Sequence, residues 1–85
     1  SNPLTEDIRV LFHMEYKVAS CVIPLLESHF GISISEDEVG YITLHVHSAI
    51  DDEKVSDAMQ TARAVRECIR IVEESMGKKI YDIVI

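Results

Sequence analysis

The stretch EDEVGYITLHVHSA, residues 36–49, decides how we interpret the rest of the chain, because it carries a full set of helix-start signals. Ser35 precedes it as an N-cap residue, and Glu38 follows three residues later, which is the spacing of a capping box. The acidic residues of the first turn suit the positive end of the helix dipole. The pattern predicts a helix that begins at Glu36 and ends near Ala49 or Ile50.

A helical wheel places His45 at the margin of the apolar face of this helix, on the same flank as Glu38 and Tyr41. His47 points well away from His45. One edge of the His45 ring can therefore pack, while the other can reach solvent or a partner. Two interpretations stay open: a half-buried structural histidine, which is the commoner case, or a chemical one. Glu38 is a candidate to orient the His45 ring, although the capping box already explains it.

The other reactive residue types form no site that the sequence can define. Residues two apart on a helix do not share a face, so one metal ion cannot easily take both His45 and His47. His13 and His29 lack metal-ligand spacing to either. No catalytic set can be assembled around the cysteines, and no Gly-rich phosphate loop occurs. We therefore expect no metal, no cofactor and no enzymatic activity.

Composition describes one small domain with enough apolar residues for a core: 85 residues, of which 47% are hydrophobic. The formal net charge of −7 argues against direct nucleic-acid binding, which needs clustered Lys and Arg. Cys21 and Cys68 lie in apolar stretches and are expected to be buried, reduced thiols. No secretory or membrane-spanning segment is apparent, so a cytoplasmic chain without membrane contact is expected.

Three further helices are expected around the central one. The first is capped by Asn2 and ends near Phe12 or His13, and the second runs from about Met14 to Phe30 and stops at Gly31. Pro24 is expected to kink the second helix. These elements predict an all-α fold, a small bundle of about four helices.

The last helix is expected from about Ser56 to Met76, after a charged linker at residues 51–54. Gly77 is expected to end it, with Lys78 and Lys79 at its C-terminal end, and residues 80–85 form a short apolar tail. An apolar stripe in this helix follows a three-four spacing typical of a bundle or coiled-coil helix. Its members are Ala62, Val65, Ile69, Val72 and Met76.

Four segments in this order resemble the PTS regulation domain (PRD) of bacterial transcriptional antiterminators and activators. They are NPL at 2–4, Tyr16 with Ala19, LE followed by FGI within 26–32, and EDEVGYITLH at 36–45. The resemblance makes residues 1–50 a PRD core segment that lacks the first helix of the family. Residues 51–85 are then a linker and a C-terminal helix, which more loosely resembles the start of a following PRD, with a short tail. A second copy of the chain could complete such a bundle.

In that family, the histidine at the Leu-His position accepts phosphate from the phosphocarrier HPr or a sugar-specific enzyme II. The resemblance therefore implies a regulatory domain of a transcriptional regulator with His45 as the phospho-acceptor. Arginines that could pair with the added charge are Arg9, Arg63, Arg66 and Arg70. The alternative is a helical dimerisation module that is not phosphorylated, in which His45 is packed; a homodimer suits both hypotheses.

Overall fold

Four α-helices make up the fold in the computed structural model, which describes residues 3–50 and 56–84. They are α1 (Pro3–Leu11), α2 (His13–Phe30), α3 (Glu36–Ile50) and α4 (Asp57–Val84). No strand occurs in these residues, so the predicted all-α bundle of about four helices is confirmed. Asn2, expected as a cap, and the expected linker at 51–54 lie outside the described residues.

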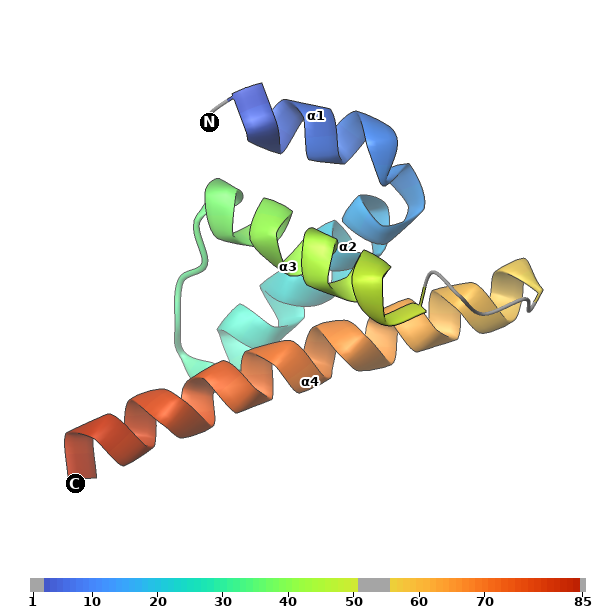
Figure 1. Cartoon of the computed structure of the whole chain (residues 1–85). Coiled ribbons are helices and arrows are strands. Elements are labelled where there is room, and N and C mark those ends of the chain that lie inside the picture. Colours follow the sequence, from blue (N-terminus) through green and yellow to red (C-terminus); the bar gives the residue numbers. More distant parts are fainter. Residues whose placement is uncertain (1–2, 51–55, 85) are drawn as a thin grey trace.

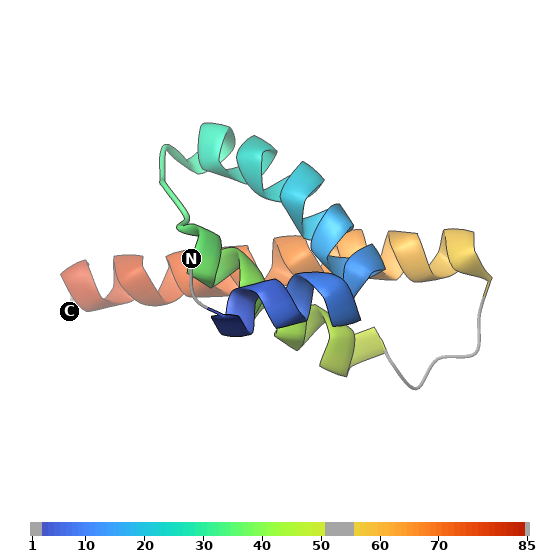
Figure 2. The ribbon, with the colours of Figure 1, turned by 90° about the horizontal axis from the view of Figure 1, so that it is seen from above.

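The long helix α4 lies across α2 and α3, and α1 covers the other side of these two helices (Figures 1 and 2). Thr5 and Ile8 of α1 are buried, and Thr5 Oγ1 donates a hydrogen bond of 2.8 Å to Asp37 Oδ1 at the start of α3. Figure 2 shows that α4 extends beyond the other helices at both of its ends. The central helix α3 is therefore held between α1 on one side and α4 on the other.

The core forms where α2, α3 and α4 meet. Its buried members are Ala19, Ile23, Ile42, Val46, Ile50, Ala64, Cys68 and Val72. Ala19, Ala64 and Cys68 are wholly buried, and their small side chains let the helices approach closely. Each fully buried Ile or Val contributes about 1.5–3 kcal/mol relative to an exposed one. Burial also raises the pKa of the Cys68 thiol to about 11, so it stays uncharged at neutral pH.

Two expectations about buried faces need correction. Cys21 is exposed, so only Cys68 is the buried thiol that was predicted. The buried stripe of α4 runs through Ala64, Cys68 and Val72, whereas Ala62 of the predicted stripe is exposed. The apolar spacing alone does not distinguish two neighbouring stripes on one helix. The small residues decide, because they permit the closest contact with α2 and α3.

The boundaries of α2 and α3 follow the predicted signals. Gly31 takes the left-handed conformation (φ 65°, ψ 37°) that ends α2, and the Ile32 N–H donates to the Glu27 carbonyl at 3.1 Å. Ser35 caps α3, because its Oγ accepts the Glu38 backbone N–H at 3.2 Å. The Ser35 hydroxyl also lies 3.4 Å from Glu38 Oε1. The helix start that was read from the sequence is therefore confirmed. α2 continues through the exposed Pro24, and the bend expected there stays a prediction.

The predicted end of the last helix at Gly77 is wrong. α4 continues through this residue to Val84, so residues 80–84 are helical and not a separate tail. A glycine ends a helix when it adopts positive φ, and Gly77 does not, unlike Gly31. Glycine within a helix costs only about 1 kcal/mol relative to alanine, and no proline follows to stop the helix. Lys78 consequently lies on the body of α4 and not at its end.

Candidate functional site

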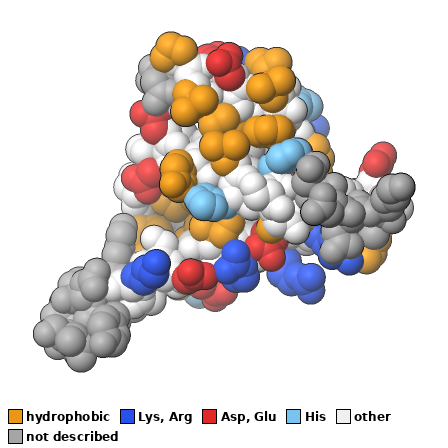
Figure 3. Space-filling model, in the orientation of Figure 1, with side chains coloured by type: hydrophobic (Ala, Val, Ile, Leu, Met, Phe, Trp, Pro, Cys, Tyr) orange, Lys and Arg blue, Asp and Glu red, His pale blue; other side chains and the backbone are white. Residues whose placement is uncertain are grey.

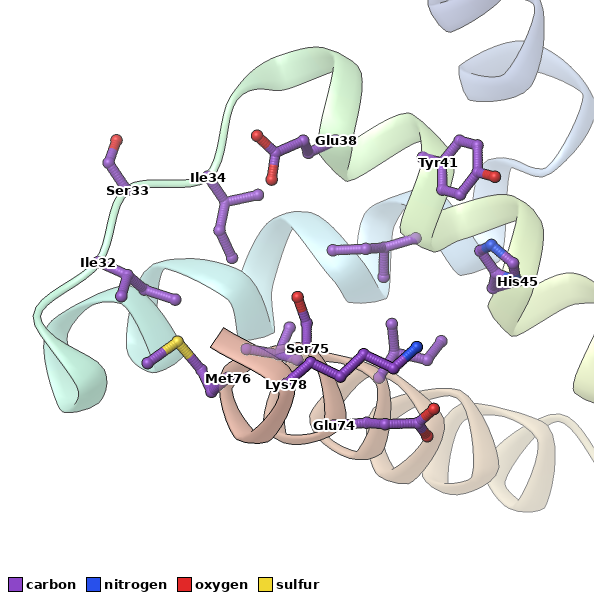
Figure 4. A pocket seen from close by; sticks show the side chains of 13 residues that line it. Ile32, Ser33, Ile34, Glu38, Tyr41, His45, Glu74, Ser75, Met76 and Lys78 are labelled. Carbon is purple, nitrogen blue, oxygen red and sulfur yellow. The ribbon is translucent and has the colours of Figure 1, made fainter. Parts of the chain in front are cut away.

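A groove of about 400 Å³ opens between α3, the loop that precedes it, and α4 (Figure 4). The α2–α3 loop follows the left-handed turn at Gly31 and leads from the end of α2 to the start of α3 (Figure 1). Apolar side chains from all three segments line the groove: Ile32, Ile34, Ile42, Ile71, Val72 and Met76. Polar groups stand around them: Ser33, Glu38, Tyr41, His45, Glu74, Ser75 and Lys78. The groove combines an apolar lining with an ionisable rim, which is the usual make-up of a binding site.

His45 lies on the rim of this groove and is exposed. Its ring contacts the exposed ring of Tyr41, one turn earlier on α3, with centroids 4.8 Å apart and planes tilted by 59°. Within the described part of the chain, no hydrogen bond or ion pair engages the His45 imidazole. The wheel prediction that His45 sits beside the buried stripe and reaches outward is confirmed. The imidazole is therefore accessible to a reagent or a protein that approaches from solvent.

Glu38 lines the same groove, but its backbone N–H and its side chain both bond the Ser35 hydroxyl. Among residues 3–50 and 56–84, none connects Glu38 to His45. The geometry supports Glu38 as part of the capping box. Its role in orienting the His45 ring stays a prediction.

His47 has different surroundings, although it is only two residues away. Its Nδ1 lies in hydrogen-bond contact with Oε2 of Glu15, and its ring stacks on Phe12 with centroids 4.0 Å apart and planes 23° apart. Glu15 is a buried carboxylate with 8% of its surface exposed. His47 thereby joins α3 to the start of α2. The predicted separation of His45 and His47 onto different faces is confirmed.

The Glu15–His47 pair was not anticipated from the sequence, although a signal was present. Glu15 lies four residues before Ala19 and eight before Ile23, and both of these are buried on α2. A carboxylate in line with a buried stripe needs a polar partner, since an unpaired charge is costly to bury. That argument predicts a partner for Glu15, but it does not identify His47.

The remaining histidines, His13 and His29, are exposed, and His29 meets Phe30 edge-on at 4.8 Å. In the described ranges, no group of three or more His, Cys, Asp or Glu could hold a metal ion. The same residues contain no helix long and apolar enough to cross a membrane.

The basic side chains differ in whether they line the groove beside which His45 lies. Arg9 pairs with Glu6 on α1 at 2.7 Å, and Arg70 pairs with Glu67 and Glu74 on α4 at 2.9 and 2.8 Å. None of the four arginines proposed from the sequence lines the groove. Lys78 does. The sequence reasoning missed Lys78 because it placed the end of the helix one residue earlier.

Comparison with known proteins gives one family. The sequence model of the PRD domain matches residues 1–49, which are 49 of 85 residues and therefore more than half of the chain. No solved structure matches. This finding agrees with the resemblance drawn from residues 2–4 and 36–45.

Curated relatives extend the similarity beyond residue 49. The "PtsGHI operon antiterminator" of Bacillus subtilis is 29% identical over 79 residues, and the "GlcA/glcB genes antiterminator" of Staphylococcus carnosus is 32% identical over 79 residues. Both alignments cover 93% of this chain and 28% of the relative. The "Beta-glucoside operon antiterminator" of Dickeya chrysanthemi is 26% identical over 76 residues, 89% of this chain and 27% of the relative. The chain spans little more than a quarter of these relatives, and on the match to residues 1–49 it belongs to the PRD domain family.

Proposed function

We propose that this chain is the regulatory part of a bacterial transcriptional regulator that the sugar phosphotransferase system controls through phosphorylation of His45. The observation that carries the proposal is the position of His45, exposed and without a hydrogen-bond partner in the described residues, on the rim of the α3–α4 groove. The aligned relatives are named as antiterminators, so we propose that the parent protein acts in antitermination.

In the proposed reaction, the domain supplies only the nucleophile, the imidazole of His45. A ring nitrogen of neutral His45 attacks phosphorus, a P–N bond forms, and the bond from phosphorus to the donor breaks. The leaving atom of the donor keeps the electron pair and takes up a proton, while the other ring nitrogen of His45 can release its own. We propose HPr, a sugar-specific enzyme II, or both as donors. Catalysis then resides in the donor, so no enzymatic activity is assigned to this domain.

A phosphotransfer assay tests the proposal. The chain is incubated with phosphoenolpyruvate and the general phosphotransferase components, with and without an enzyme II, and labelling is measured by intact mass. The wild-type chain should gain one phosphoryl group and His45→Ala should gain none. His29→Ala is the matched control, because His29 is exposed on α2 and does not line the groove. Equal labelling of wild type and His45→Ala would refute the assignment.

We also propose that two copies of the chain associate. Large apolar side chains on α1 support this, since Leu4 is 62% exposed, Val10 70% and Leu11 73%. Hydrophobic side chains gather on the part of the surface where α1 lies (Figure 3). Leu4 and Leu11 are seven residues apart and share one side of α1, as a helix–helix contact requires. Sedimentation of wild type and Leu11→Glu tests this: a wild-type dimer should dissociate in the variant. A wild-type monomer at high concentration would argue against it.

For the domain arrangement, we propose that α4 is the opening helix of a following PRD. The family match ends at residue 49, whereas the curated relatives align over about nine-tenths of the chain, which includes much of α4. α4 also extends beyond the other helices at both ends, which leaves room for further packing (Figure 2).

A further inference from the structure

α4 supplies the charged wall of the groove that faces His45. The charged side chains lining the groove in the described part of the chain are Glu38, Glu74 and Lys78. Glu74 already binds Arg70 at 2.8 Å, whereas Lys78 takes part in no ion pair with any described residue. Figure 4 shows the Lys78 side chain lying along α4, with its ammonium on the side of the groove that His45 occupies. Among the described residues, the ammonium of Lys78 is thus an unpaired positive charge in the same groove as the proposed acceptor.

We propose that Lys78 is a positioning residue that holds a phosphoryl group on His45, with the Ser75 hydroxyl as a second donor. This inference rests on the proposed function, because it concerns the same histidine. Ser75 lines the groove one turn before Lys78, and its hydroxyl points into the groove (Figure 4). An ammonium and a hydroxyl are suitable donors for phosphate oxygens, and a charge-assisted bond is the stronger of the two.

The carboxylates of the groove, Glu38 and Glu74, oppose this arrangement because they repel a phosphoryl group. A phosphoryl group adds close to two negative charges. Glu74 is partly neutralised by Arg70, and Glu38 is bonded to Ser35 at the positive end of α3. Lys78 has a long, flexible stem and no ion-pair partner among the described residues, so it can move to the phosphate. The attraction should therefore exceed the repulsion.

This arrangement has a structural consequence. His45 belongs to α3 and Lys78 belongs to α4, so a phosphoryl group held by both joins the two helices. Phosphorylation should then strengthen the contact between α3 and α4, the helix that projects beyond the bundle (Figure 2). Without Lys78, the same phosphoryl group would face Glu38 and Glu74 alone and should weaken that contact.

Chemical phosphorylation tests Lys78 independently of any donor protein. Phosphoramidate transfers its phosphoryl group to histidine and releases ammonia, and site-resolved mass spectrometry gives the rate at each histidine. We expect His45 to react faster than the exposed His29, because Lys78 attracts the anionic reagent. Lys78→Gln should lower the ratio of His45 to His29 labelling about threefold, as one local charge typically does. Lys78→Arg should restore the ratio, and the matched control Lys17→Gln, an exposed lysine of α2, should not change it.

The second measurement is the melting temperature of chemically phosphorylated protein. Phosphorylation should raise Tm by about 2–4 °C in wild type and should lower it or leave it unchanged in Lys78→Gln. An unchanged labelling ratio with the same Tm shift in both proteins would overturn the inference. So would failure of His45 to react while His29 reacts. If His45 reacts with phosphoramidate but not with the phosphotransferase components, the proposed function fails, and Lys78 is still tested.

Discussion

His45 and His47 are two residues apart on one helix, and they differ in their exposure and in the groups that contact their rings. His45 is exposed, touches the exposed Tyr41, and borders a groove that α4 completes. His47 is half-buried, stacks on Phe12, and pairs with the buried Glu15 of α2. The difference arises because the His45 side of α3 borders the groove with α4, whereas His47 packs against the start of α2. The position on the helix, and not the residue type, leaves His45 exposed at the groove and places His47 in a packed ion pair.

The largest expected effect comes from removing the imidazole of His47, the packed histidine. His47→Ala should lower the free energy of unfolding by about 2–3 kcal/mol, because it leaves Glu15 buried without this partner. His45→Ala should change it by less than about 0.5 kcal/mol, as surface substitutions usually do. Urea denaturation followed by circular dichroism measures both. Similar losses in the two variants would show that the histidines are not divided in this way.

A double-mutant cycle assigns the His47 effect to its partner. Glu15→Gln should also be destabilising, and Glu15→Gln combined with His47→Gln should cost less than the sum of the two single changes. Additive losses would mean that the pair itself contributes little and that His47 acts through the Phe12 stack instead.

A smaller effect is expected from the aromatic neighbour of each histidine. Phe12→Ala should cost about 1–2 kcal/mol, since it removes a half-buried ring and its stacking contact with His47. Tyr41→Ala should be nearly neutral, because 65% of Tyr41 is exposed. Thermal melts of the two variants compare them directly. A larger loss for Tyr41→Ala than for Phe12→Ala would contradict the assignment of His47 to the packed side.

The smallest effect tests the helix that carries both histidines. Ser35→Ala should cost about 1 kcal/mol through loss of the N-cap bond to Glu38. Ser33→Ala is the control in the same loop, since it is exposed and caps no helix, and it should be close to neutral. Phosphoryl acceptance by His45 should persist in both variants, because His45 lies more than two turns beyond the cap. Loss of acceptance in Ser35→Ala would show that the start of α3 controls the site.

Local signals explain how much of this could be predicted. Ser35, Glu38 and Gly31 fix the boundaries of α2 and α3 through contacts within a few residues, so the sequence predicted them correctly. The same reasoning failed at Gly77, because whether a glycine takes positive φ depends on the chain beyond it. Because the helix was predicted to end at Gly77, Lys78 was not recognised as a groove residue. Lys78 faces the groove only if the helix continues.

Contacts between residues on helices far apart in the sequence could not be predicted from the sequence. His45 could be placed on a flank by helical periodicity, and the PRD resemblance gave it a role. Glu15 and His47 are 32 residues apart, and no pattern in either helix specifies that they meet. The predicted stripe of α4 missed Ala64 and Cys68 for a similar reason, because their burial depends on close packing against α2 and α3.

The most direct test is to locate the phosphoryl group by NMR in protein labelled by the phosphotransferase components. Long-range ¹H–¹⁵N spectra resolve the imidazole of each histidine, and coupling to ³¹P marks the one that carries phosphorus. We expect coupling at His45 and unchanged signals from His47, because the His47 ring keeps its contact with Glu15. Coupling at His47, or phosphorylation confined to His13 or His29, would contradict it.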